Sequence, residues 1–107
     1  MKIENHINSR GKSKVTLSGE FDAYGSSTIH PVFEGLVESD NIRGVSINMK
    51  NVGFIDSSGI GEVVFLFKRL RESNRSLELV GVRGQVKEVL ELTGIHRAIA
   101  TSRSGWE

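Results

Sequence analysis

The apolar residues of this chain switch repeatedly between two spacings, one typical of strands and the other of helices. Apolar residues that alternate with polar ones predict strands, and apolar residues spaced three and four apart predict amphipathic helices. Strand patterns mark Lys2–Ser9, Val15–Phe21, Val45–Met49, Leu77–Val82 and Ala98–Ala100. Helical patterns mark Ile29–Val37, Ile60–Leu70 and Val86–Leu90. Because strands and helices alternate after an initial strand pair, the sequence predicts an α/β fold.

The order of these elements also predicts the layout of the sheet. The polar turn Arg10–Ser13 joins the first two strands into an antiparallel hairpin, and each later strand returns through a helix by a right-handed crossover. We therefore expect a single domain over residues 1–107, with a mostly parallel sheet of four to five strands and three to four helices. Residues 103–107 are expected to be a frayed tail, unless Trp106 docks on the domain.

Several residues bear on where the helices begin and end. The second helix is expected to end near Ser73 and Asn74, and Gly94 suits the position just past the C-terminus of the third helix. Pro31 lies within the first helical pattern, where a proline would remove a backbone hydrogen bond. If Thr28 is the N-cap, Pro31 falls at the third helical position, whose N–H has no partner within the helix. We therefore expect the first helix to begin after Thr28.

The composition limits the classes of partner and chemistry. The formal net charge is +1, so no strong field attracts nucleic acid or an anionic membrane, and neither is an expected partner. The absence of cysteine excludes disulfides and thiolate metal sites and fits a cytoplasmic protein. No stretch approaches the ~18 apolar residues of a transmembrane helix, so we expect no direct membrane insertion. The three histidines lack ligand spacing, so we expect no metal site at His6, His30 or His96.

The motifs of several common enzyme classes are missing from the sequence. It contains no G-x-x-x-x-G-K-[ST] phosphate loop and no G-x-G-x-x-G dinucleotide fingerprint. It has no G-x-S-x-G elbow, and no histidine is placed to act as the base for a serine nucleophile. We therefore expect the chain to be no enzyme and to need no cofactor of its own.

The most informative short motif is Asp56-Ser57-Ser58-Gly59, between the third strand and the second helix. Loops at the carboxyl ends of parallel strands meet at one sheet edge, so this loop is expected beside Glu20 and Asp22. Helix N-termini carry free N–H donors and partial positive charge. Asp and Ser are favoured N-caps, and a serine there is also a suitable phosphate acceptor, so both interpretations stay open.

The second helical pattern has a mixed face opposite its apolar stripe. At 100° per residue from Ile60, the core side collects Val63, Val64, Phe67 and Leu70. The opposite side is expected to collect Ser58, Gly61, Glu62, Phe65, Arg69 and Glu72. An exposed aromatic beside small residues suits a docking patch, although single exposed aromatics are also ordinary. We therefore expect a partner to bind at Ser58, Gly61, Glu62, Phe65 and Arg69.

Four segments resemble those of one known family, in the same order along the chain. They are Val15–Asp22, which resembles a strand reading roughly L-x-G-x-L-D, and Val45–Met49, Phe54–Gly61 and Val86–Ile95. Together they resemble the STAS domains, and specifically the anti-sigma factor antagonists, with the serine loop as the most specific part. The resemblance covers nearly the whole chain, and Phe21 departs from it where leucine is common.

This resemblance implies a function based on partner switching. The first serine after the aspartate, Ser57, would be the phosphoacceptor, with Asp22, Asp56, Ser58 and Gly59 around it. A serine kinase of the anti-sigma type would bind the unphosphorylated domain and release its sigma factor. The kinase would then phosphorylate Ser57 with ATP and magnesium, which ends the binding, and a PP2C-type phosphatase would restore it.

Two other interpretations remain open from the sequence. One is a STAS module of a different circuit, such as secretion or biofilm regulation, or of a lipid-transport complex. The intact Asp-Ser-Ser-Gly motif favours a phosphorylated switch over the transport role. The other is a small nucleotide-binding or nucleotide-hydrolysing enzyme, which turnover of ATP or GTP by the pure protein would reveal.

Overall fold

The computed structural model describes residues 1–106 and confirms the α/β class expected from the sequence. The elements are β1 (Lys2–Ile7), β2 (Lys12–Phe21), α1 (Ala23–Glu38), β3 (Gly44–Ile55), α2 (Ser57–Glu72), β4 (Ser76–Val80), α3 (Gly84–Leu92), the 3-10 turn η1 (Ile95–Arg97) and β5 (Ala100–Thr101). The five strands lie in the order β1-β2-β3-β4-β5. β1 pairs with β2 antiparallel, and all later pairs are parallel, as the hairpin-plus-crossover pattern predicts.

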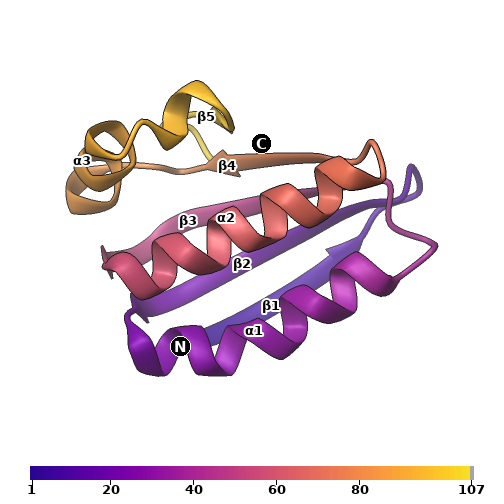
Figure 1. Cartoon of the computed structure of the whole chain (residues 1–107), viewed down its shortest axis with the longest axis horizontal. Helices are drawn as coiled ribbons and strands as arrows, with labels where there is room; N and C mark the ends of the chain where they lie inside the picture. Colours follow the sequence, from indigo (N-terminus) through magenta and orange to yellow (C-terminus); the bar gives the residue numbers. More distant parts are fainter. Residues whose placement is uncertain (107) are drawn as a thin grey trace.

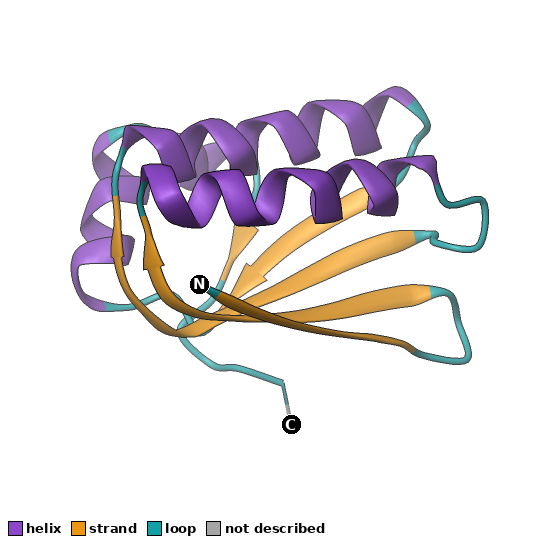
Figure 2. Cartoon of the chain, turned by 90° about the horizontal axis from the view of Figure 1, so that it is seen from below, coloured by secondary structure: helices purple, strands orange, loops and turns teal. Residues whose placement is uncertain are grey.

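The helices and the sheet form two layers. α1 and α2 lie side by side over one face of the sheet (Figure 1), while the C-terminal segment runs along the opposite face (Figure 2). The core between the layers is made of fully buried apolar side chains from β2, β3, α1 and α2: Val15, Leu17, Phe21, Ile29, Phe33, Ile47, Val63, Leu66 and Leu70. In β2 and in the first half of β3, every second residue therefore faces the helices, which is the period-two pattern seen in the sequence.

The start of α1 differs from the expectation that Thr28 is its N-cap. The helix begins at Ala23, because the Asp22 carboxylate accepts a hydrogen bond from Gly25 N at 2.9 Å and caps it. Pro31 therefore lies well inside the helix and deprives the Ser27 carbonyl of its usual donor. Burial of Ile29 and the later apolar residues of α1 outweighs that missing bond, which local sequence rules could not show.

The core side of α2 is also rotated from the predicted one. Its buried residues are Gly59, Val63, Leu66 and Leu70, whereas Val64 and Phe67 are only partly buried. At 100° per residue, the buried side is turned by roughly 60° from the predicted stripe, which omitted Leu66. The reason is that α2 packs on the sheet and against α1 at the same time. Glu62 and Phe65 are consequently partly buried on the flank that faces α1, and Arg69 lies beside Phe65 but is exposed.

The C-terminal part of the chain differs in detail from the expectation. Residues 95–97 form the short turn η1, and the last strand is Ala100–Thr101 rather than Ala98–Ala100. Gly94, with a φ of 78°, follows α3 in the position predicted for it. The tail expected to fray is held as far as Trp106, whose Nε1 donates to Ser46 Oγ at 2.7 Å. Glu107 lies outside the described residues.

Arg75, in the turn after α2, closes the C-terminal end of α1. Its guanidinium donates to the Val37 carbonyl oxygen at 2.6 Å and reaches those of Leu36, Ser39 and Ile42 at 3.4–3.5 Å. α1 has no basic residue in its own last turn, so this distant side chain supplies the cation that the terminal carbonyls favour. The planar guanidinium can reach several carbonyls at once.

We expect Arg75→Lys to lower the free energy of unfolding by about 1–2 kcal/mol, because one ammonium cannot serve several carbonyls in the geometry of the guanidinium. Arg75→Ala should cost more, about 2–3 kcal/mol, since several buried acceptors then lose their donor. Urea unfolding measures both changes. Arg97, which is exposed, offers a control whose replacement by alanine should stay within about 0.5 kcal/mol of wild type. Wild-type stability of Arg75→Lys would contradict this account.

Candidate phosphorylation and partner-binding site

The expected convergence of two loops at one sheet edge is found in the structure. β2 and β3 stay paired to their last residues, where Phe21 lies opposite Ile55 and Asp56 N donates to the Phe21 carbonyl oxygen at 3.3 Å. The N-termini of α1 and α2 therefore start from neighbouring strands. Asp22 and Asp56 are the residues that make these two turns, so the loop acids expected near the serine motif do lie at its edge of the sheet.

The cap of α2 is Asp56, and this assigns different roles to the acid and the serines of the motif. One Asp56 carboxylate oxygen accepts from Ser58 N at 2.9 Å and from Gly59 N at 3.3 Å. Ser57 is the first residue of the helix and is exposed. Within residues 1–106, no hydrogen bond involves the Ser57 hydroxyl. That hydroxyl is thus accessible for modification, and the aspartate performs the capping.

Asp22 has a structural role that its sequence position did not reveal. It was expected to surround the phosphorylation site as a loop acid, and its carboxylate is the N-cap of α1. Glu20 belongs to the end of β2 and is exposed. Two capping carboxylates therefore stand on neighbouring strand ends, and the edge that carries Ser57 is already negatively charged.

Gln85, which sequence reasoning missed, holds the end of β3 in place. β4 pairs with β3 only as far as Asn48, so the last residues of β3 have no strand partner on that side. At Ile55, the side chain of Gln85 takes the place of the missing strand partner. The Gln85 amide nitrogen donates to the Ile55 carbonyl oxygen at 2.8 Å, and Ile55 N donates to Gln85 Oε1 at 2.9 Å. The residue just before Asp56 is thereby fixed by a side chain from the start of α3. A glutamine in a helical pattern carries no sequence signal for such a contact.

Gly59 allows the first turn of α2 to pack directly on the ends of β2 and β3. A Cβ at this position would lie 2.5 Å from the Phe21 carbonyl oxygen and 2.7 Å from Ile55 Cγ1. Gly61, two residues further along the helix, is exposed, and a Cβ there would have no neighbouring atom within 4 Å. The two glycines of the motif thus differ: Gly59 serves close packing, and Gly61 leaves a bare patch of helix surface.

Phe65 is half-buried, not exposed as expected. Its ring centroid lies 4.8 Å from that of His30 on α1, and the Arg69 guanidinium carbon lies 5.6 Å from it. Glu62 points to the same place, with Oε1 2.8 Å from His30 Nδ1. Glu62, Phe65 and Arg69 therefore form one cluster with His30, on the flank of α2 that faces α1, while Ser58 and Gly61 lie closer to the helix start. Sequence reasoning considered His30 only as a metal ligand and missed this contact.

The Glu62 carboxylate raises the pKa of His30 above its ordinary value of 6.5, chiefly through their hydrogen bond. The negative charges of Glu62 and Glu34 act in the same direction, and partial desolvation opposes them. Glu34 is one turn away on α1, with Oε1 3.7 Å from His30 Nε2. The protonated imidazole is therefore favoured between two carboxylates.

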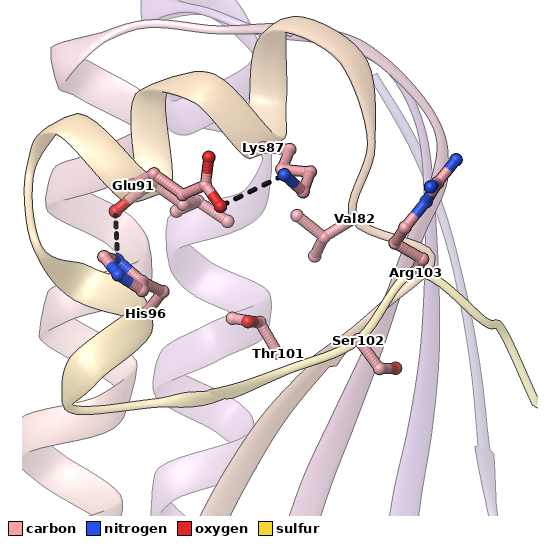
Figure 3. A pocket seen from close by; sticks show the side chains of 8 residues that line it. Val82, Lys87, Glu91, His96, Thr101, Ser102 and Arg103 are labelled. Carbon is pink, nitrogen blue, oxygen red and sulfur yellow. Dashed lines mark hydrogen bonds and ion pairs between the residues drawn. The ribbon is translucent and has the colours of Figure 1, made fainter.

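Two hollows accompany these features. One of about 660 Å³ lies along the outer part of α2 and is lined by Phe65, Lys68, Arg69, Arg71 and Glu72. The other, of about 150 Å³, lies between α3 and the C-terminal segment (Figure 3). In it, Lys87 and Glu91 pair with each other at 3.1 Å, and His96 Nδ1 lies 3.3 Å from the Leu90 carbonyl oxygen. The hollow beside Phe65 adjoins the expected partner surface, and the smaller one is separate from it.

Two further findings concern metals and membranes. Within residues 1–106, no three side chains of histidine, aspartate or glutamate come together as they would to hold a metal ion. None of the helices in the same range has both the length and the apolar content to cross a bilayer.

Comparisons with known proteins agree on one family. A family model described as STAS domain matches residues 3–104. The anti-sigma-B factor antagonist of Staphylococcus aureus is 29% identical over 82 residues, which are 77% of this chain and 75% of that protein. An anti-sigma-factor antagonist (STAS) domain protein of Planctomyces limnophilus is similar in structure, with a TM-score of 0.83 and 21% identity over 95% of this chain and 89% of that one. The Bacillus cell fate determinant SpoIIAA in its phosphorylated form is also similar in structure, with a TM-score of 0.75 and 18% sequence identity over 94% of this chain and 90% of that one.

We expect Gly59→Ala to lower the free energy of unfolding by about 1–3 kcal/mol, because the added methyl group meets a backbone oxygen that cannot move aside. Gly61→Ala is the matched control: its methyl group meets open space, and alanine in place of a helical glycine should stabilise by about 0.5–1 kcal/mol. Thermal or urea unfolding of the two variants compares them directly. Equal stability of both variants would show that the first turn of α2 is not tightly packed.

Proposed function

The chain belongs to the STAS domain family, and we propose that it is a partner-switching protein of the anti-sigma factor antagonist type. The observation that carries this proposal is Ser57, which is exposed at the first position of α2 while Asp56 provides the cap. A serine that is not used as a cap is accessible to a kinase and can change the surface charge. The similarity to an anti-sigma-B factor antagonist supports the same assignment.

In the unphosphorylated state, the domain binds a serine kinase of the anti-sigma type through the α2 surface. We define this partner surface as Ser58, Gly61, Glu62, Phe65 and Arg69. The bare Gly61 lets a partner approach closely, and Phe65 supplies aromatic area of the kind that dominates binding energy at interfaces. Binding of the kinase by this domain releases the sigma factor that the kinase otherwise holds. The domain acts as ligand and phosphate acceptor and not as catalyst.

Phosphorylation ends this binding through charge. The kinase transfers the γ-phosphoryl group of magnesium-bound ATP: the bond from Ser57 Oγ to phosphorus forms, the bond to ADP breaks, and the hydroxyl proton passes to the kinase. The phosphate adds a charge of about −1.5 to −2 beside Asp56. Ser58 N and Gly59 N already donate to Asp56, so these N–H groups are not free to neutralise the phosphate. The new charge therefore repels the partner, until a PP2C-type phosphatase removes the phosphate.

We expect the cognate kinase to phosphorylate Ser57 and not Ser58. Mass spectrometry should find one phosphate on wild type and on Ser58→Ala, and none on Ser57→Ala. Ser57→Asp should weaken binding to the kinase about tenfold or more, because it places a like charge at the partner surface. The backbone of α2 should move by less than about 1 Å on phosphorylation. Phosphate on Ser58 alone, or a backbone shift well above that limit, would refute the scheme.

We expect Phe65→Ala to weaken kinase binding by about thirtyfold, equivalent to about 2 kcal/mol. Because the ring is half-buried, the same change should also lower the free energy of unfolding by about 1–2 kcal/mol, less than the ~3–5 kcal/mol of a core phenylalanine. Phe33→Ala, at a fully buried position of α1, is the core control. Calorimetric titration with the kinase, together with thermal unfolding, separates the two effects. Normal binding by a folded Phe65→Ala protein would remove Phe65 from the partner surface.

A further inference from the structure

A histidine from the neighbouring helix is built into the partner surface. His30 of α1 approaches α2 at two points: Nδ1 lies 2.8 Å from Glu62 Oε1, and the ring centroid lies 4.8 Å from that of Phe65, at an angle of 48°. α1 and α2 run side by side along the sheet, so this contact bridges two elements that are distant in sequence (Figure 1). The Glu62 side chain is only 16% exposed, whereas that of His30 is 40% exposed and open to solvent or to a partner.

The position of Phe65 depends on these contacts. Its ring is in contact with the His30 ring from α1 and with the Arg69 guanidinium from its own helix. A half-buried phenylalanine without such neighbours can adopt other rotamers, and a binding partner must then immobilise it. We propose that His30 is a positioning residue of the partner surface: bound to Glu62, it holds the Phe65 ring ready for the kinase, and it holds it less firmly once the imidazole loses its proton. This inference rests on the function proposed above.

The charged groups around His30 favour its protonated form. Glu62 faces it from α2 and Glu34 from its own helix, and Arg69 lies on the far side of the cluster, against Phe65. β2 also packs on α1, and the residues that it turns toward the helix layer are the uncharged Ser13, Val15, Leu17 and Phe21. The two carboxylates raise the pKa of His30 above 6.5. The contribution of the charged contact is therefore complete below pH 6.5 and is lost as the pH rises through the raised pKa.

The loss on deprotonation is partial. A neutral imidazole can still donate from Nδ1 to the Glu62 carboxylate, and that hydrogen bond remains assisted by the charge of the carboxylate. What is lost is the attraction of the imidazolium for the Glu62 and Glu34 carboxylates. The effect on the partner is therefore moderate. We expect the affinity of the unphosphorylated domain for its kinase to fall about threefold to tenfold between about pH 6 and about pH 8.

The test compares the pH profiles of wild type, His30→Gln and a control histidine variant. Dissociation constants for the kinase are measured without ATP, so that Ser57 stays unmodified. His30→Gln can still bond to Glu62 but lacks both the ring and the charge, so it should bind more weakly near pH 6 and lack the wild-type decline. His6→Gln, at an exposed position on β1, should keep the wild-type profile. Subtracting the His30→Gln profile from that of wild type removes titrations that belong to the kinase. An unchanged profile in His30→Gln overturns the inference.

A second measurement needs no partner. In the isolated domain, NMR titration should move the Phe65 ring resonances with the same midpoint as those of His30. Glu62→Gln should lower that midpoint, because it removes the main cause of the raised pKa. If the Phe65 resonances do not shift as His30 titrates, the positioning role is wrong, independently of any result with the kinase. If His30 and Phe65 titrate together but wild type binds no kinase at any pH, the proposed function is wrong, and the partner half of this inference falls with it.

Discussion

The parallel pairing of β2 with β3, maintained to the last residue of each strand, determines the geometry of the candidate site. Because Phe21 lies opposite Ile55, Asp22 and Asp56 leave the sheet next to each other, and each caps the helix that follows it. α1 and α2 therefore begin together and descend the same face of the sheet. The contact between His30 and Glu62 lies about two turns into α1 and about one and a half turns into α2, and it follows from that common origin.

The end of β3 is held by more than strand pairing. On one side, β2 accompanies it to Ile55, and on the other, where β4 has already ended, the Gln85 amide occupies both backbone groups of Ile55. Gly59 then lets the first turn of α2 rest on the same strand ends. Asp56 and Ser57 stand between these two fixed points. The loop that presents the serine is consequently a rigid junction, which is the property that a precise recognition site needs.

The order of the elements and the serine loop were predictable because both depend on short-range patterns. Alternation identified β2 and the first half of β3, and the strand–acid–serine–helix succession placed Ser57 at a helix start. The start of α1 was predicted wrongly, because a local rule about Pro31 was given more weight than the capping ability of Asp22. The orientation of α2 was wrong because a helical wheel assumes one buried side, whereas this helix packs on the sheet and on α1. Phe65 was therefore expected in solvent and is half-buried.

The residues that no pattern could reveal are polar side chains that act over long sequence distances. Gln85 binds the backbone of β3, Arg75 closes the end of α1, and His30 joins Glu62 across two helices. Each contact depends on how the elements are packed, so neither spacing nor composition signals it. Glutamine and arginine are mostly found on protein surfaces and histidine is intermediate, so none of the three residue types by itself indicates a buried contact. Long-range polar contacts are thus the part of the site that only the folded structure reveals.

A rigid junction also determines how a phosphate on Ser57 would act. Asp56 already satisfies the donors at Ser58 N and Gly59 N, so the phosphate gains little by drawing the helix start into a new arrangement. What changes is charge. Two unit charges ~6 Å apart interact by ~3 kcal/mol at an effective dielectric of ~20, and that energy corresponds to roughly a hundredfold change in affinity when it opposes a partner. A hundredfold change is enough to separate bound from free states, so the proposed switch requires no change of fold. In the proposed function, the strand ends hold the serine in place, the flank of α2 provides the contact area, and the phosphate on Ser57 would control whether a partner binds there.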